Sequence, residues 1–154
     1  MIKLLSGVLV MAGMALFISC GGASKEVINA KNSTVDKNET LKGGEFYQFE
    51  IQLEDQMTAI GVDGEWRVND GGDRKAKVFV MDEENFLKYD KDEAFKSYYD
   101  SGEKIHDNFK IRLTNQYKSK KTLYYLVFDN PSEEDDKKIE FHLQLVYEWG
   151  EGTR

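Results

Sequence analysis

Few residues of this sequence could act as a nucleophile or bind a transition metal, because it contains one cysteine and two histidines. His106 stands beside Asp107, and His142 lies on the polar side of an alternating segment. The histidines are isolated in the sequence, and Cys20 is the only thiol. A zinc site needs three or four converging ligands. We therefore interpret both histidines as surface residues and predict no metal site and no cofactor.

Hydrolytic chemistry has little support in the sequence. The Gly-x-Ser-x-Gly turn that presents the nucleophile of many hydrolases is missing. Ser101, Glu103 and His106 lie close together in the sequence, but a catalytic triad depends on a spatial geometry that a loop does not hold. Paired carboxylates for glycoside cleavage are supported only by the abundance of acidic residues. We predict a protein without enzymatic activity, with an envelope hydrolase or metal-dependent enzyme as the alternative.

Acidic residues gather in several loops and raise the question of calcium. They cluster at 70–73, 82–84, 90–93 and 133–136. Loop carboxylates suit Ca²⁺, yet none of these clusters matches the twelve-residue EF-hand pattern. The last cluster runs directly into Lys137 and Lys138 and is typical of a solvated hairpin loop. We interpret the clusters as solvent-exposed loops and leave calcium binding as the alternative.

Two adjacent tyrosines are the candidates for ligand binding. Tyr98 and Tyr99 fall in a long connection over residues 90–108, where an exposed ring can stack on a sugar or a peptide. Other aromatic residues belong to alternating apolar segments, and the alternation around Trp149 predicts that this ring lies in the core. Tyr98 and Tyr99 are therefore the predicted ligand-binding residues, and no catalytic residue is predicted.

The first twenty residues differ in composition from everything that follows. Lys3 is the only charged residue before Cys20, and residues 4–18 form an apolar run that contains two glycines and one serine. This run is shorter than the roughly 20 residues that a membrane-spanning helix needs. A short apolar run behind a positive charge is typical of a secretory signal, so we predict a signal peptide over residues 1–19.

The end of this run, Phe17-Ile18-Ser19-Cys20, resembles the lipobox of bacterial lipoproteins. In that family the cysteine thiol receives a diacylglycerol, the leader is cleaved before the cysteine, and the new amine is commonly acylated. The resemblance implies that Cys20 is the lipidation site and the first residue of the mature chain, although Phe17 stands where the family usually has leucine. Gly21 in place of aspartate implies the outer membrane and leaves the membrane face open. Several acyl chains on one residue give a lasting attachment without a spanning helix.

The mature chain carries 20 basic and 28 acidic residues, a net charge of −8, once Lys3 is removed with the leader. It offers no basic face for phosphates, so we predict no binding to nucleic acids. Without a second cysteine it can form no internal disulfide. Residues 20–44 are polar, and we predict a flexible tether there, with room for a short strand near 26–30 or 33–35.

From residue 45 onward the apolar residues alternate with polar ones, which is typical of half-buried strands. The predicted strands fall within residues 47–53, 59–68, 75–81, 109–113, 123–128 and 139–149. Residues 69–72 carry a turn signal, and Asp82 is a suitable N-cap for one short helix. The sequence predicts an all-β fold, an antiparallel β-sandwich of jelly-roll or immunoglobulin-like type, over residues 45–149, followed by a tail at 150–154.

One further segment suggests a family. Residues 78–86 and the run Tyr124-Tyr125-Leu126-Val127-Phe128-Asp129-Asn130 resemble the sandwiches of GOLD domains and of bacterial pre-peptidase C-terminal domains. The resemblance covers residues 44–149 and implies a non-catalytic extracytoplasmic module. We therefore predict an envelope lipoprotein that is anchored to the membrane by its lipid and binds a protein or a glycan. A purely structural envelope component is the second alternative, beside the enzyme considered above.

Overall fold

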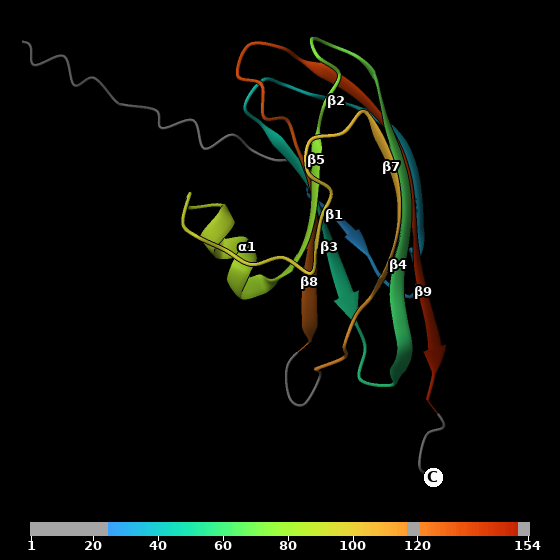
Figure 1. Cartoon of the computed structure of the whole chain (residues 1–154). Helices are drawn as coiled ribbons and strands as arrows, with labels where there is room; N and C mark the ends of the chain where they lie inside the picture. The colour runs from blue at the N-terminus through green and yellow to red at the C-terminus, as the bar shows by residue number, and fades with distance from the viewer. Residues whose placement is uncertain (1–24, 117–120, 151–154) are drawn as a thin grey trace, which may run out of the picture.

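The computed structural model describes residues 25–116 and 121–150 (Figure 1). The predicted signal peptide at 1–19, the lipidation site Cys20 and residues 151–154 of the tail lie outside the described residues. The elements are β1 (Lys25–Ile28), β2 (Thr34–Leu41), β3 (Phe46–Leu53), β4 (Met57–Asp70), β5 (Lys77–Asp82), α1 (Glu83–Tyr89), β6 (Tyr99–Asp100), β7 (His106–Arg112), β8 (Thr122–Asp129) and β9 (Lys137–Trp149). Within these ranges no helix is long and apolar enough to cross a membrane.

The strands form two sheets that pack face to face. One sheet has five strands in the order β1-β3-β8-β5-β6, and the other has four in the order β2-β9-β4-β7. All strand pairs are antiparallel except β1 with β3. Figure 1 shows the two layers edge-on, with α1 outside the five-stranded sheet. The prediction of an all-β antiparallel sandwich with one short helix is confirmed.

Aromatic side chains from both sheets meet in the core. Phe128 stacks on Phe141 with ring centroids 4.7 Å apart, and Phe49 meets the edge of Phe141 at 5.4 Å. Trp66 packs against Phe128 at 6.5 Å in an edge-to-face contact. Each of these rings sits on the inward side of an alternating strand and is at most 2% exposed. Edge-to-face and stacked pairs of this kind hold two sheets in one relative position.

Trp149 does not lie in this core, so the prediction from its alternation is wrong. Its side chain is 52% exposed and contacts the ring of Tyr147 at 5.3 Å. Trp149 pairs with Met57, the first residue of β4, so it stands at the end of the sheet. Alternation predicts which side of a strand faces the core, but it does not predict how far the opposite sheet extends to cover that side.

A second apolar cluster lies between α1 and the outer face of the five-stranded sheet. The helix begins as predicted, because the Asp82 carboxylate accepts a hydrogen bond from the Asn85 backbone N–H at 2.9 Å. Phe86 of the helix stacks on Tyr125 of β8 with centroids 4.1 Å apart. The helix therefore covers one outer sheet face, whereas the outer face of the four-stranded sheet carries no helix among the described residues.

The folded domain begins earlier than predicted. Strands β1 and β2 lie inside residues 20–44; they overlap the short strand expected near 26–30 or 33–35, but both are present and β2 runs on to Leu41, so residues 25–41 belong to the folded domain and not to a tether. The inward positions of β2 are Val35, Lys37, Glu39 and Leu41. Two of these four residues are charged, so the inward positions of this strand do not form the apolar series by which a half-buried strand is predicted. The strand is held instead by pairing with β9 along its whole length.

The charges on β2 protect an open edge of the sandwich. Lys37 of the edge strand β2 forms an ion pair with Glu26 of the edge strand β1, so one inward-facing pair joins the two sheets. An inward-facing charge on an edge strand prevents another chain from adding a strand there. Lys37 Nζ also lies 3.5 Å from the hydroxyl of Tyr47. The edge is thus closed by charge rather than by apolar packing.

We expect the Glu26→Val/Lys37→Val double variant to self-associate. Replacing both members removes the pair and leaves only Glu39, which also contacts Lys37 at 3.6 Å but is 32% exposed to water, so the free energy of unfolding should stay within about 1 kcal/mol of wild type. The edge, however, becomes apolar and open to pairing between chains. Sedimentation velocity over a range of concentrations measures the association. Thr40→Val adds an apolar group to the outward side of the same strand and should remain monomeric; a monomeric double variant would contradict the prediction.

Candidate functional site

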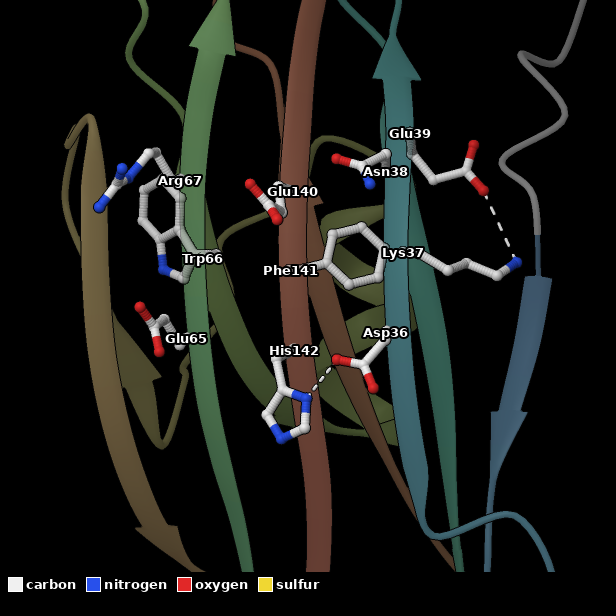
Figure 2. Close-up of a pocket in the computed structure, with 10 residues that line it drawn as sticks. All are labelled: Asp36, Lys37, Asn38, Glu39, Glu65, Trp66, Arg67, Glu140, Phe141 and His142. Atoms are coloured by element: carbon white, nitrogen blue, oxygen red, sulfur yellow. Dashed lines mark hydrogen bonds and ion pairs between the residues drawn. The ribbon is translucent and has the colours of Figure 1, made fainter.

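The outer face of the four-stranded sheet is polar and open. Along β9 the residues Phe141 and Leu143 point into the core, so Glu140, His142 and Gln144 point outward. The same alternation along β4 turns Glu65 outward. Figure 2 shows Glu65, Glu140 and His142 on the sheet surface, with His142 between β2 and β4. Every functional side chain of this face is positioned by a regular strand.

Strand pairing arranges the outward residues in rows across the sheet. The first row is Asp36, His142, Glu65 and Asn108, taken from β2, β9, β4 and β7. The next row is Asn38, Glu140, Arg67 and His106. Two residues that pair directly on one face of a sheet lie within side-chain contact distance. His142 and His106 thus fall in different rows, on strands separated by β4.

This face is hollowed. A cavity of about 640 Å³ is lined by residues of β2, β4 and β9, and a second of about 370 Å³ is lined by residues of β4, β7 and β9. Both are lined by Glu65 and His142, so they form one depression, which we call the sheet hollow. Each cavity lies in the size range of binding sites for small ligands.

Some charged groups of the sheet hollow are paired and others are free. His142 Nδ1 pairs with the Asp36 carboxylate, and Asn69 donates to Glu140 Oε2 at 3.2 Å. Glu65 and Arg67, two positions apart on β4, form no side-chain hydrogen bond or ion pair with any described residue. Their charged groups can therefore bind another molecule without first breaking a contact in this domain.

The polar groups of the sheet hollow are largely exposed to water. The side chains of His142 and Asp36 are 51% and 72% exposed, so their pair is in contact with water. Catalytic acids and bases are tuned by burial and by neighbouring charges, and neither cavity is lined by a described serine, threonine or cysteine. Among the described residues, no group of three histidine, cysteine, aspartate or glutamate side chains could hold a metal ion.

The structure separates the two predicted ligand-binding tyrosines. Tyr98 is 51% exposed, and its hydroxyl donates to Asp82 at 3.3 Å. Tyr99 packs on Phe109 at 5.0 Å and donates to Asp107 at 2.5 Å; burial, followed by this hydrogen bond, raises the pKa of its hydroxyl well above the usual range. Neither tyrosine lines the sheet hollow. Their role in ligand binding stays a prediction.

Sequence reasoning placed His142 on a polar strand face but missed its neighbours on β2. Asp36 and Asn38 lie in residues predicted as tether, and their alternation is masked by inward charges. Glu65 and Arg67 do alternate with Trp66 and Val68 in the sequence. That pattern could have predicted an outward polar pair. It could not have predicted that the sheet face is hollowed at this pair.

Comparison with known proteins finds a limited likeness of structure. No family model and no curated protein sequence matches this chain. The pre-peptidase C-terminal domain of a Bacillus anthracis collagenase has a TM-score of 0.49 at 10% identity, over 80% of this chain and 96% of that domain. PliG, a periplasmic inhibitor of g-type lysozyme, has a TM-score of 0.39 in two species. The Salmonella Typhimurium protein is 11% identical over 79% of this chain and 99% of its own, and the Aeromonas hydrophila protein is 6% identical over 80% and 100%.

The first of these structures belongs to the pre-peptidase C-terminal class that the sequence resembles. With TM-scores below 0.5 and identities of 6–11%, the three structures assign neither a family nor a function to this chain. The functional argument therefore rests on the sheet hollow itself.

Proposed function

We propose that this chain is a lipid-anchored, non-catalytic protein of the bacterial envelope that binds a protein partner through the sheet hollow. The observation that carries the proposal is the difference between its two outer faces. One carries an apolar cluster that α1 covers, whereas the other is polar, hollowed and holds two charged side chains without partners. A purely structural component would have no reason to keep such a hollow open.

The composition of the sheet hollow favours a basic partner. Its outward carboxylates are Asp36, Asp63, Glu65 and Glu140, against the cations of Arg67 and Lys110. This acidic excess attracts positive groups and raises the rate of encounter with a basic surface. Specific hydrogen bonds can then form to the Arg67 guanidinium and to Asn38.

A protein fits this surface better than a glycan. The rings that line the cavities are Trp66, Phe109 and Phe141, and all three are buried beneath the sheet. A sugar therefore finds no exposed aromatic face here on which to stack. Charged groups of both signs on a concave sheet are instead suited to the polar rim and hydrogen-bond pattern of a protein interface.

The anchor is the second half of the proposal. Cys20 is the only cysteine, and it follows a short apolar leader that ends in a lipobox-like run. Gly21 favours delivery to the outer membrane. A Cys20→Ser variant should lose incorporation of labelled palmitate and should move from the detergent phase to the aqueous phase. Unchanged labelling and partitioning in that variant would remove the anchor from the proposal.

Charge reversal in the sheet hollow tests the binding function. Native envelope fractions are crosslinked to the purified lipoprotein, the captured protein is identified, and its affinity is measured with purified components. We expect Glu65→Lys/Glu140→Lys to weaken that affinity by about 10- to 100-fold, since lost attraction and new repulsion together cost about 1.4–2.8 kcal/mol.

The matched control is Glu83→Lys/Glu93→Lys, which makes the same change of charge on the α1 side. It should bind as wild type does. Equal affinity of both double variants would show that the captured protein does not use the sheet hollow, and the proposed site would be abandoned.

A further inference from the structure

We infer that the anchored domain lies with its α1 side against the bilayer, so that the sheet hollow opens away from the lipid. The inference rests on the lipid anchor of the proposed function. It adds a second surface, the exposed side of α1, which the short tether holds against the lipid headgroup layer that carries Cys20. The length of the tether and its point of attachment carry the argument.

The tether is short. The folded domain begins with β1 at Lys25, so four residues separate it from Cys20. A fully extended chain advances at most about 3.6 Å per residue, so Lys25 can lie no more than about 18 Å from the lipidated residue. A longer tether, such as the one predicted over residues 20–44, would have let the domain rotate freely.

The tether joins the domain on the side that carries α1. The Lys25 ammonium pairs with the carboxylate of Glu50 on the outer face of the five-stranded sheet. Glu50 is the strand-pair neighbour of Tyr125, and Tyr125 stacks on Phe86 of α1. An unbroken series of contacts thus leads from the start of β1 to the helix. Figure 1 shows α1 on one side of the sandwich and β4, β7 and β9 on the other.

The short tether keeps the helix within reach of the headgroups. An α-helix with its side chains is about 10 Å thick, which is less than the 18 Å reach of the tether. The sheet hollow lies behind both sheets, which pack about 10 Å apart, and therefore about 20 Å from the lipid once the helix is included. Leu87 of α1 is 50% exposed, and Tyr98, 51% exposed, lies beside the start of the helix, where its hydroxyl donates to the N-cap residue Asp82. A ring with a hydroxyl suits the boundary between headgroups and water.

The experiment places a fluorescent probe on each face of the anchored protein. Because lipidation blocks the sulfur of Cys20, the variants Leu87→Cys and Asn108→Cys each carry one free thiol for an environment-sensitive dye. Asn108 lies on β7 in the sheet hollow. The lipidated proteins are reconstituted into phosphatidylcholine liposomes with and without a headgroup-quenching lipid. Quenching should be several-fold stronger at position 87 than at position 108.

A second pair of proteins carries 20 Gly/Ser residues inserted after Gly22, which allow a root-mean-square reach of about 25 Å. Quenching at position 87 should then fall toward the value at position 108. Equal quenching of both positions with the natural tether would overturn the orientation, and so would a signal at position 87 that the insertion leaves unchanged. A protein that does not float with liposomes would instead refute the anchor, which is a failure of the proposed function and is distinguished by flotation alone.

Discussion

The Asn130→Asp variant is expected to lose more stability than Asn130→Ala, although aspartate is the closer match in size. Asn130 is 1% exposed, and its amide nitrogen lies 3.3, 3.0 and 2.7 Å from the carbonyl oxygens of Leu41, Lys42 and Asp135. Alanine leaves these carbonyls without a donor, at a cost of about 1–3 kcal/mol for each group left unsatisfied. An ionised carboxylate adds repulsion and the cost of a buried charge, so we expect losses of about 3 kcal/mol for alanine and about 4 kcal/mol or more for aspartate.

Urea denaturation of the mature domain at pH 7 measures both losses. Asn38→Asp is the matched control, because Asn38 is exposed on β2 and should tolerate the same change within about 0.5 kcal/mol. At low pH the Asn130→Asp carboxyl can take up a proton and donate again, so its deficit relative to Asn130→Ala should shrink. If aspartate were tolerated as well as alanine at pH 7, the amide would not be the donor that joins these loops.

Asn130 also shows where sequence reasoning stops. The pair Asn130-Pro131 indicates a turn, and a turn does follow β8, but the same side chain reaches residues 88 and 89 positions away in the sequence. A local pattern describes which backbone conformations a residue favours. It carries no information on which distant carbonyls the folded chain brings to that residue.

The strands that could be predicted are those whose inward side is wholly apolar. The period-two alternation is clear in β3, β7 and β9, the continuous apolar runs of β5 and β8 indicate strands buried on both faces, and the Asp82 cap indicates the helix at residues 83–89; the two-residue strand β6 was not predicted. Strand β2 escaped because Lys37 and Glu39 take inward positions at an open edge. Apolar residues alternate with polar ones because one side of the strand is buried. A strand whose inward side is only partly buried can carry charged residues there, and the alternation then no longer predicts the strand.

The candidate site depends on topology more than on any motif. Its rows join β2 to β9, strands that lie about a hundred residues apart, through pairs such as Asp36 with His142. The sequence predicts which residues of β4 and β9 are polar and outward, but it does not predict that these two strands are neighbours in the sheet. Tyr98 and Tyr99 were predicted because two adjacent aromatic residues stand out in a polar loop. The polar residues of a regular strand do not stand out from their neighbours in this way.

The acidic run at 133–136, predicted as a solvated loop, is exposed, but Lys137, the residue that follows it, is completely buried. It begins β9 on the inward side, with 0% of its surface exposed. Its ammonium donates to Asp73 Oδ1 at 2.9 Å and to the backbone carbonyl of Lys75. The neighbouring Lys138 is 68% exposed, so two identical side chains in one pair serve opposite roles. Because charged residues continue without a break from 133 to 138, the sequence does not show that β9 begins at Lys137.

We expect Lys137→Ala to lower the free energy of unfolding by about 3–4 kcal/mol at pH 7, through an unpaired carbonyl and a cavity. Lys137→Met keeps most of the packing and should cost about 2 kcal/mol, since it loses mainly the polar contacts. The matched variant Lys138→Met should change the free energy by less than about 0.5 kcal/mol. Chemical denaturation of the three variants against wild type gives these values directly. Equal effects at positions 137 and 138 would contradict the burial.

The pH dependence of the Lys137→Met deficit tests the charge separately from the packing. The hydrogen bond from Lys137 is the largest of the causes that lower the pKa of Asp73 below its usual range. A lowered pKa in the folded state adds stability above the unfolded value, and that stability is lost as pH falls through the folded value. Lys137 also acts against the burial that raises the pKa of Asp129. Removing the lysine abolishes the attraction between its ammonium and the carboxylates of Asp73 and Asp129. That loss matters only while these carboxylates are charged. The deficit of Lys137→Met should therefore be largest near pH 7 and shrink as pH falls below 4, whereas a deficit that stays constant with pH would assign the whole effect to packing.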